Sequence, residues 1–382
     1  MEYQICKNCV MDISDPDIVF DENGVCNHCR SYEDRKKIFT IKEEEKPRQL
    51  QALIDFCKKK GQGKKYDCII GVSGGVDSTF VAYKVKEIGL RPLAVHLDNG
   101  WDAELAVSNI HNVLKKLEIE LYTHVLDWEE FRSLQVAFLK ASTPDSEIPS
   151  DHAIVALMKS IAAKEDLPLI WGVNFSSESI LPRTWSQGHM DWAYIKKVNN
   201  LFGTKKLKDF PHYSVYKRIY WNRIKDLRIF ELLNYINYDK EQAKKFLIEE
   251  LGWRDYGGKH HESIYTKFFQ AYILPTKFGF DKRRAHLSSL ILSGQIKREE
   301  ALKEIEDPPY NEKELQEHLI YVPKKLGLTR EEFEEIMSAP PRRYEDYSPY
   351  FPKAVLRLES MIFRSLIKIK KKIIKTPKQD YV

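Results

Sequence analysis

Four features are scarce in this sequence, and each scarcity excludes a class of protein. No apolar stretch approaches the roughly 20 residues of a membrane-spanning helix. The six cysteines in 382 residues are not scattered like the disulfide framework of a secreted chain. The N-terminal stretch is charged and lacks the apolar core of a signal peptide. The formal net charge is only +5, which is small for a large nucleic-acid footprint. We therefore expect a cytoplasmic protein with no membrane span and no nucleic-acid partner.

What the sequence does contain divides into three parts. A hydrophobic content of 43% is enough for a sizeable core, and the length suggests two or three domains. Residues 1–32 form a cysteine-bearing module, and residues 33–204 form an α/β domain. Residues 205–382 show helical periodicity, aromatics and charge without clear strands, which indicates a helical region for a substrate or partner.

The middle part alternates short apolar runs with helical patterns. The strands expected here are 68–72, 93–97, 120–126 and 169–173, and the helices are 49–60, 77–88, 102–117 and 128–164. Gly89 is a suitable C-terminal cap for the helix at 77–88. This alternation predicts a parallel sheet with helices on both faces, and the ligand site then lies at the carboxyl edge of the strands.

A glycine-rich segment joins the first of these strands to its helix, and it carries the strongest functional signal. It reads Ser73-Gly74-Gly75-Val76-Asp77-Ser78. Adjacent glycines let the backbone approach phosphate oxygens, while the loop N–H groups and the helix N-terminus supply positive potential. No lysine precedes the final serine, so the loop is not a Walker A motif, and its spacing is not G-x-G-x-x-G.

Two Cys-x-x-Cys pairs lie near the N-terminus. Cys6 and Cys9 form one pair, Cys26 and Cys29 form the other, and sixteen residues lie between the two pairs. Each pair can hold one side of a tetrahedral ion, so the spacing predicts a structural four-cysteine Zn²⁺ site in a zinc ribbon. A redox dithiol is the less favoured interpretation, because two pairs stand at zinc-ribbon spacing.

The Ser-Gly-Gly-Val-Asp-Ser loop resembles that of the PP-loop ATP pyrophosphatase superfamily, which implies an adenine nucleotide alpha-hydrolase-like fold. The resemblance implies that the loop holds the pyrophosphate part of ATP, that Asp77 helps to position Mg²⁺, and that AMP and pyrophosphate are released. It makes Asp77 and Ser78 the catalytic positions. The residues expected near the nucleotide are Ser73, Gly74, Gly75, Val76, Asp77, Ser78, His96, Asp98, Gly172 and Asn174. His96 lies in an apolar run, so a core histidine is the alternative.

Most of the chain also resembles the N-acetyl sugar amidotransferase family, and the resemblance weakens in about the last forty residues. The resemblance is carried by the zinc module, the loop and the segments Leu251–Gln270 and Phe280–His286. It implies an ATP-dependent ligase that acts in the biosynthesis of bacterial surface polysaccharides, including lipopolysaccharide O-antigens, or of nonulosonic acids. The acetamido oxygen of an N-acetylated, perhaps nucleotide-linked, sugar would attack the α-phosphate of ATP. Ammonia would then displace AMP from the adenylated imidate and leave an acetamidino group.

This chemistry requires a source of ammonia. An N-terminal-nucleophile glutaminase needs a cysteine at position 2, where this chain has Glu2, and neither Cys57 nor Cys68 lies in a nucleophile elbow. The family resemblance implies separate glutaminase and ammonia-channelling subunits like those of histidine biosynthesis.

Charged residues outside the loop are candidate contacts for the phosphate or the sugar. Each one alone is better explained as part of a solvated face, but the group is dense and mixed with glycine and aromatic residues. The candidates are Lys196, Lys197, Lys259, His261, Glu262, Lys267, Lys282 and Arg283. The final helical pattern, Val355 to Ile373, is followed by a basic tail and is interpreted as a solvated helix with a frayed end.

Two alternatives remain. The first is a PP-loop enzyme that thiolates tRNA, although only Cys57 and Cys68 remain to carry sulfur or hold an iron–sulfur cluster. The second is a non-catalytic scaffold that binds zinc and a nucleotide, against which the intact phosphate loop counts.

Overall fold

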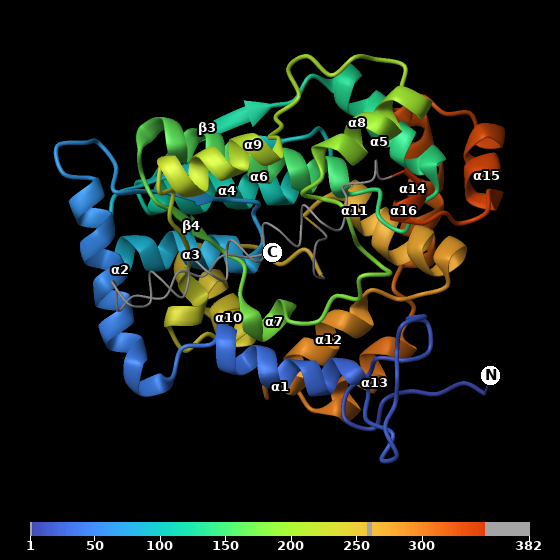
Figure 1. The fold of residues 1–382 in the computed structure, drawn as a ribbon, viewed down its shortest axis with the longest axis horizontal. Coiled ribbons are helices and arrows are strands. Elements are labelled where there is room, and N and C mark those ends of the chain that lie inside the picture. Colours follow the sequence, from blue (N-terminus) through green and yellow to red (C-terminus); the bar gives the residue numbers. More distant parts are fainter. Residues whose placement is uncertain (1, 258–261, 348–382) are drawn as a thin grey trace.

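A five-stranded parallel sheet stands at the centre of the protein, as seen in a computed structural model that describes residues 2–257 and 262–347 (Figure 1). The strands are β1 (Cys68–Gly71), β2 (Pro92–Asp98), β3 (Glu120–Val125), β4 (Leu169–Trp171) and β5 (Ile229–Glu231). Every neighbouring pair is parallel. The expected α/β class is confirmed, and the four expected strands are present within a few residues of their predicted bounds.

The strand order β3-β2-β1-β4-β5 places a topological switch point between β1 and β4. The chain first builds β2 and β3 on one side of β1 and then crosses to build β4 and β5 on the other side. Ile69 in β1 pairs with Leu93 of β2 and with Leu169 of β4. In doubly wound sheets, ligands bind outside the carboxyl ends of the strands at such a switch point. The loops that follow β1 and β4 flank this position.

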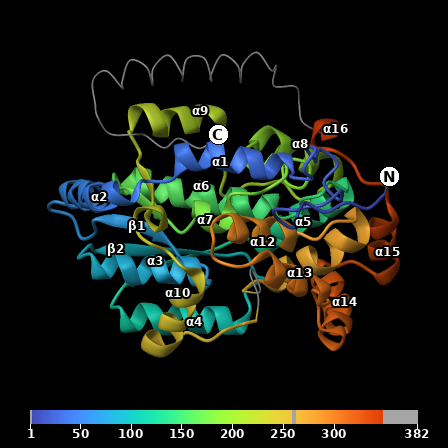
Figure 2. The same ribbon diagram turned by 90° about the horizontal axis from the view of Figure 1, so that it is seen from below.

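Helices cover both faces of the sheet, as expected (Figure 2). One face packs against α6 (Ile148–Glu165), and the other against α3 (Val76–Glu87) and α4 (Glu104–Lys116), with α10 (Lys240–Leu251) outside them. The remaining α-helices are α1 (Asn27–Phe39), α2 (Lys46–Lys60), α5 (Trp128–Ala141), α7 (Phe175–Glu178), α8 (Trp192–Phe202), α9 (Val215–Ile219), α11 (Ile264–Phe268), α12 (Arg283–Leu292), α13 (Arg298–Glu306), α14 (Glu312–Leu326), α15 (Arg330–Ser338) and α16 (Tyr344–Tyr347).

Local sequence signals set the ends of the helices next to the sheet. Gly89 adopts a φ of +76° after α3, in the left-handed region that glycine enters without a steric penalty. Asp239 caps the start of α10 by accepting a hydrogen bond from the Gln242 N–H, and Gly252 ends that helix with a φ of +68°. These signals define the ends of α3, which packs on the sheet, and of α10, which packs on α3.

The third part of the chain differs from the expectation that it lacks strands. Strand β5 lies in this part, and Ile229 pairs with Leu169, so the sheet extends across the boundary expected at residue 204. Three residues are too few for a strand to show its period-two pattern in the sequence. The helical pattern at 355–373 lies outside the described residues.

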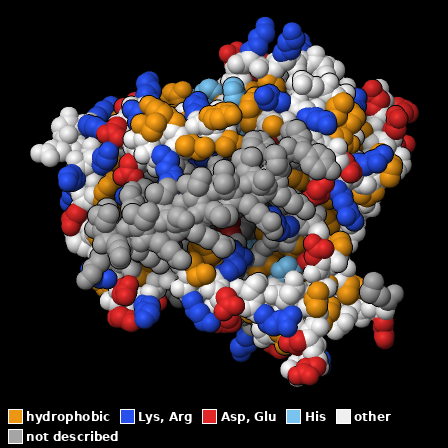
Figure 3. All heavy atoms as spheres, viewed as in Figure 1, with side chains coloured by type: hydrophobic (Ala, Val, Ile, Leu, Met, Phe, Trp, Pro, Cys, Tyr) orange, Lys and Arg blue, Asp and Glu red, His pale blue; other side chains and the backbone are white. Residues whose placement is uncertain are grey.

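The surface and the helices add two observations. Basic and acidic side chains are interspersed over the face drawn in Figure 3, so the described residues form no broad area of one charge there. Among the described residues, no helix is both long enough and apolar enough to span a bilayer.

Candidate functional site

The phosphate loop joins β1 to α3 and lies at the switch point between β1 and β4. Its second residue, Gly74, has a φ of +81°, and a Cβ atom built there would lie 2.8 Å from the Ala106 carbonyl oxygen of α4. Both the dihedral angle and the close approach require glycine. The Gly74 carbonyl accepts a hydrogen bond of 2.9 Å from Trp253 Nε1, and Trp253 is buried. The backbone of the loop is therefore fixed from two sides.

The loop hydroxyls face one another beside the end of β4. Ser73 Oγ and Ser78 Oγ lie 3.1 Å apart, and the Ser73 N–H donates to Ser78 Oγ at 3.2 Å. A Cβ atom on Gly172 would lie 3.3 Å from the backbone nitrogen of Ser78, so β4 ends directly against the first turn of α3. The structure thus brings Ser73, Ser78 and Gly172 together. The first N–H groups of α3 supply the positive potential that an anion needs.

Three residues expected at the adenosine end have mainly structural roles instead. His96 is 7% exposed, and its ring lies between the Val72 carbonyl oxygen at 2.9 Å and Asp102 Oδ2 at 3.0 Å. Asp98 accepts a hydrogen bond from the Gly100 N–H in the turn after β2. Asn174 is 1% exposed and caps α7 through its Oδ1 atom. His96 and Asn174 are both buried in this structure, and their contact with the nucleotide stays a prediction.

The His96 contacts have an electrostatic consequence. Burial lowers the pKa of His96, but the hydrogen bond and the negative charge of Asp102 outweigh burial and raise the pKa overall. Both neighbouring oxygens accept hydrogen bonds, which favours a doubly protonated ring. The imidazolium links the start of the phosphate loop, at Val72, to the segment after β2.

The third part of the chain contributes aromatic side chains that sequence analysis did not single out. Tyr238 Oη donates a hydrogen bond to Asp77 Oδ1. The Tyr256 hydroxyl and Glu262 Oε1 each lie 3.3 Å from where a Cβ atom of Gly75 would stand. The Val76 N–H also lies in hydrogen-bonding reach of the Tyr256 hydroxyl. Tyr256 and Trp253 fall in the segment used for the family resemblance, but nothing in the sequence distinguishes Tyr238.

Glu262 is the one predicted substrate contact that the described structure places beside the phosphate loop. Its carboxylate lies near the N-terminus of α3, where it would repel a phosphate that arrived without a cation. Burial, followed by the charges of Glu262 and Asp77, raises the pKa of Tyr256. The region around Gly75 is therefore rich in negative charge, which suits a nucleotide that binds together with a cation.

A second group of charged side chains surrounds the start of α6. Lys282 Nζ lies 3.4 Å from Glu147 Oε2, and Asp145 and Asp151 stand close by. Desolvation, strengthened by the charges of Asp145 and Glu147, raises the pKa of Asp151 to about 8. Burial lowers the pKa of Lys282, but the three carboxylates outweigh burial and raise it. Lys282 therefore compensates buried negative charge, which is a structural role and not the predicted contact with a phosphate.

The other predicted substrate contacts lie elsewhere. Lys196 and Lys197 are exposed on α8, which packs against α5, and Lys196 stands over the Trp192 ring. Lys267 forms an ion pair of 2.6 Å with Glu314. Arg283 pairs with Asp281 and donates to the carbonyl oxygens of residues 304 and 307. Both Lys267 and Arg283 thus join parts of the helical region, and their contact with a substrate stays a prediction. Lys259 and His261 lie outside the described residues.

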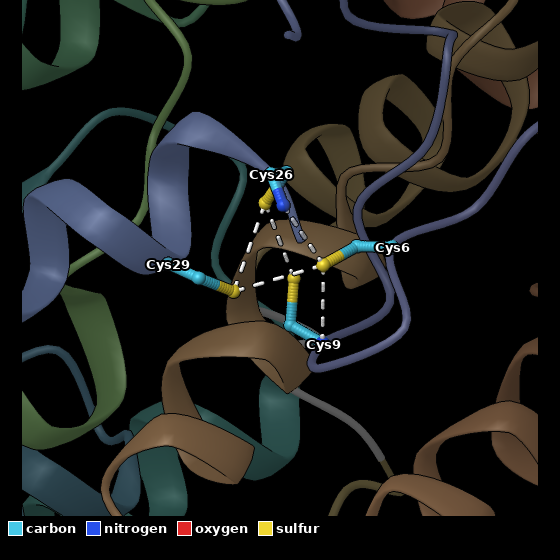
Figure 4. Close-up of side chains that lie close together, drawn as sticks. All are labelled: Cys6, Cys9, Cys26 and Cys29. Atoms are coloured by element: carbon cyan, nitrogen blue, oxygen red, sulfur yellow. Dashed lines mark hydrogen bonds between the residues drawn. The ribbon is translucent and has the colours of Figure 1, made fainter. Parts of the chain in front are cut away.

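The four N-terminal cysteines form a compact tetrahedron of sulfur atoms (Figure 4). The sulfurs of Cys6 and Cys29, Cys9 and Cys26, and Cys26 and Cys29 are 3.8, 3.7 and 3.7 Å apart. Sulfurs about 2.3 Å from a central ion form a tetrahedron with edges of about 3.75 Å, so the cluster fits one Zn²⁺ ion. Among the described residues, this is the group of cysteine, histidine and acidic side chains close enough to hold a metal ion.

The cysteine module is joined firmly to the helical region. Arg298 of α13 donates to the carbonyl oxygens of Cys6 and Cys9 at 2.8 and 3.0 Å. Ser288 of α12 accepts a hydrogen bond from the Val10 N–H. His28, which lies beside the second cysteine pair in the sequence, has its Nε2 atom 2.7 Å from Asp15 Oδ2. A metal ion here would stabilise the contact with α12 and α13 as well as the module itself.

The sheet order and the loop at its switch point define the chain as an α/β protein of the PP-loop fold class. Residues 262–358 match the family model described as the C-terminal domain of WbpG-like LPS biosynthesis proteins. An uncharacterized protein of Methanocaldococcus jannaschii, MJ1599, is 24% identical over 278 residues, which cover 69% of this chain and 80% of that protein.

Solved structures of low similarity include two enzymes. The NH3-dependent NAD synthetase from Campylobacter jejuni is 19% identical, with 53% of this chain and 77% of that chain covered and a TM-score of 0.29. The U34-tRNA thiolase NcsA from Methanococcus maripaludis, solved with its [4Fe-4S] cluster, is 14% identical, with 79% and 89% covered and a TM-score of 0.32. Since these TM-scores are low, the fold class follows from the sheet order and the loop.

Proposed function

We propose that this protein is an ATP-dependent N-acetyl sugar amidotransferase of bacterial surface-polysaccharide biosynthesis. It converts the acetamido group of an N-acetylated, nucleotide-linked sugar into an acetamidino group and releases AMP and pyrophosphate. The main support for this proposal is that one chain contains two features. A Ser-Gly-Gly-Val-Asp-Ser loop lies at the switch point of a parallel sheet, and a WbpG-like LPS biosynthesis domain follows it at residues 262–358.

The phosphate loop supplies the binding chemistry of this proposal. The N–H groups at the start of α3 and the Ser73 and Ser78 hydroxyls hold the pyrophosphate part of ATP. Mg²⁺ arrives with the nucleotide and neutralises charge that develops on the phosphate oxygens. Asp77 provides a carboxylate for that ion. Catalysis then depends on holding the acetamido oxygen in line with the α-phosphate, since no protein nucleophile is required.

We propose Zn²⁺ as the structural metal of the four-cysteine cluster. The 3.7 to 3.8 Å separations of the sulfurs match a single tetrahedral ion, whereas a [4Fe-4S] cluster places its own inorganic core between the thiolates and holds them farther apart. Four thiolate ligands leave no open position, so the site stabilises the fold and does not take part in the reaction.

We also propose that ammonia reaches the site from separate subunits, a glutaminase and an ammonia-channelling protein similar to those of histidine biosynthesis. The support is the family resemblance together with the cysteine inventory. Cys57 and Cys68 are both buried, and burial raises the pKa of both thiols, which makes them inert as nucleophiles.

The test is to incubate the purified protein with ATP, Mg²⁺, ammonium and a panel of UDP- and CMP-linked or free N-acetyl sugars. Chromatography separates AMP and pyrophosphate from ADP and phosphate, and mass spectrometry detects the exchange of one oxygen for an NH group in the sugar. We expect AMP with one sugar only. Asp77→Asn should abolish AMP formation, whereas Asp55→Asn, a matched change at an exposed position of α2, should not.

The same assay separates the alternatives. AMP formed only with tRNA and a sulfur donor would support tRNA thiolation and contradict the sugar proposal. Absence of AMP with every sugar, with tRNA and with the partner subunits present would support a non-catalytic scaffold.

A further inference from the structure

A tyrosine outside the phosphate-loop motif contacts the acidic residue of that motif. Tyr238 lies between β5 and α10, and its hydroxyl donates a hydrogen bond to Asp77 Oδ1. Asp77 belongs to the first turn of α3, more than 150 residues earlier in the chain. The contact therefore depends on the third part of the chain and not on the loop sequence.

The protein holds the Tyr238 ring rigidly. Tyr238 is 9% exposed, and its ring packs against Phe80 of α3 with a centroid distance of 5.7 Å. The next residue, Asp239, is the N-cap of α10, and α10 packs along α3. The hydroxyl therefore has few alternative positions, which lowers the entropy cost of its hydrogen bond.

The Tyr238 hydroxyl is the donor of this hydrogen bond, because a carboxylate can only accept. It can orient a carboxylate but cannot replace that carboxylate as a ligand for a cation.

We propose that Tyr238 is a positioning residue that orients the Asp77 carboxylate for the Mg²⁺ ion that accompanies ATP. The inference rests on the proposed use of Mg²⁺ and ATP at the phosphate loop. By fixing Asp77 Oδ1, the Tyr238 hydroxyl sets the plane of the carboxylate and favours the rotamer in which the group faces the nucleotide. Groups that orient a metal ligand in this way commonly change metal affinity on the order of tenfold to a hundredfold when they are removed.

The experiment measures binding of α,β-methylene-ATP by calorimetry over a series of Mg²⁺ concentrations, which requires no sugar and no turnover. Tyr238→Phe keeps the ring that packs on Phe80 and removes only the hydroxyl. We expect the Mg²⁺ concentration for half-maximal binding to rise by about tenfold or more. Nucleotide binding without Mg²⁺ should be unchanged, and binding should recover at high Mg²⁺. Tyr83→Phe is the matched control. Tyr83 lies on α3, and its hydroxyl, like that of Tyr238, donates a hydrogen bond to a carboxylate, in this case Glu87 at 2.7 Å.

The outcomes separate the inference from the proposed function. If the wild type binds the nucleotide with Mg²⁺ and Tyr238→Phe shows the same Mg²⁺ dependence, the positioning role is wrong and the proposed function stands. A loss of binding that Mg²⁺ cannot restore, with or without a lower melting temperature, would also overturn the inference, since it indicates a purely structural role. If the wild type binds no nucleotide at any Mg²⁺ concentration, the proposed function fails and the inference fails with it.

Discussion

Replacing Gly74 with alanine tests the geometry of the phosphate loop directly. The φ of +81° at this position is costly for any residue with a Cβ atom, and the new Cβ would stand 2.8 Å from the Ala106 carbonyl oxygen and 3.2 Å from the Ala106 Cβ. The left-handed conformation costs about 1–2 kcal/mol, and an overpacked contact that cannot relax adds about 1–3 kcal/mol. Gly74→Ala should therefore lower the free energy of unfolding by about 2–5 kcal/mol.

Gly63→Ala isolates the conformational part of this cost. Gly63 has a φ of +74°, but nothing lies within 4 Å of the Cβ that would be added there. This variant should be destabilised by only about 1–2 kcal/mol. Urea unfolding of the two variants and the wild type measures their free energies of unfolding. The additional loss in Gly74→Ala, compared with Gly63→Ala, is the cost of the contact with α4.

A second measurement connects this geometry to function. Any relaxation of the clash must move the loop away from α4, and such a movement displaces the N–H groups of Gly75 and Val76. Gly74→Ala should therefore lose binding of ATP, whereas Gly63→Ala should keep it. The reasoning would be refuted if the two variants proved equally stable, or if Gly74→Ala bound ATP like the wild type.

Three further predictions follow from the metal cluster and the buried charges. Cys9→Ser should lower the bound zinc measured by mass spectrometry and the melting temperature; unchanged zinc would contradict the site. Burial lowers and Asp102 raises the pKa of His96, with a net rise. A raised histidine pKa stabilises the fold below its unfolded value of about 6.5 and ceases to do so as the pH rises through the folded pKa. Asp102→Asn should therefore cost more stability at pH 5.5 than at pH 9, and an equal cost would count against this interpretation. Burial raises the pKa of Asp145, which is 4% exposed, above its usual value near 4, so the fold loses stability as the pH rises from about 4 through that raised pKa. Asp145→Asn should be more favourable to the melting temperature at pH 9 than at pH 4, and a pH-independent effect would exclude this titration.

Much of the α/β part was predictable because its signals are local. The apolar run at 68–71, the glycines of the loop and the alternation of strands with helices each depend on a few neighbouring residues. The cysteine spacing likewise predicts which side chains can bind one ion, and the structure places the four sulfurs together. Strand β5 escaped prediction because three residues carry no readable period.

The roles of individual charged residues were less predictable. Lys267 and Arg283 resemble phosphate contacts in the sequence, but the fold provides Glu314 and Asp281 as their partners. A charged side chain interacts with whatever the tertiary structure brings within a few ångströms, and the sequence of one segment does not contain that information.

The sequence by itself determined the parallel α/β architecture, the position of the phosphate loop and the set of cysteines, because hydrophobic period, backbone freedom and ligand spacing are properties of short segments. Only the tertiary structure decided what surrounds Asp77. Tyr238, Trp253 and Tyr256 come from the third part of the chain and reach the loop through the packing of α10 on α3. Their position depends on how the whole chain buries its apolar surface, and it cannot be predicted from the sequence of any short segment.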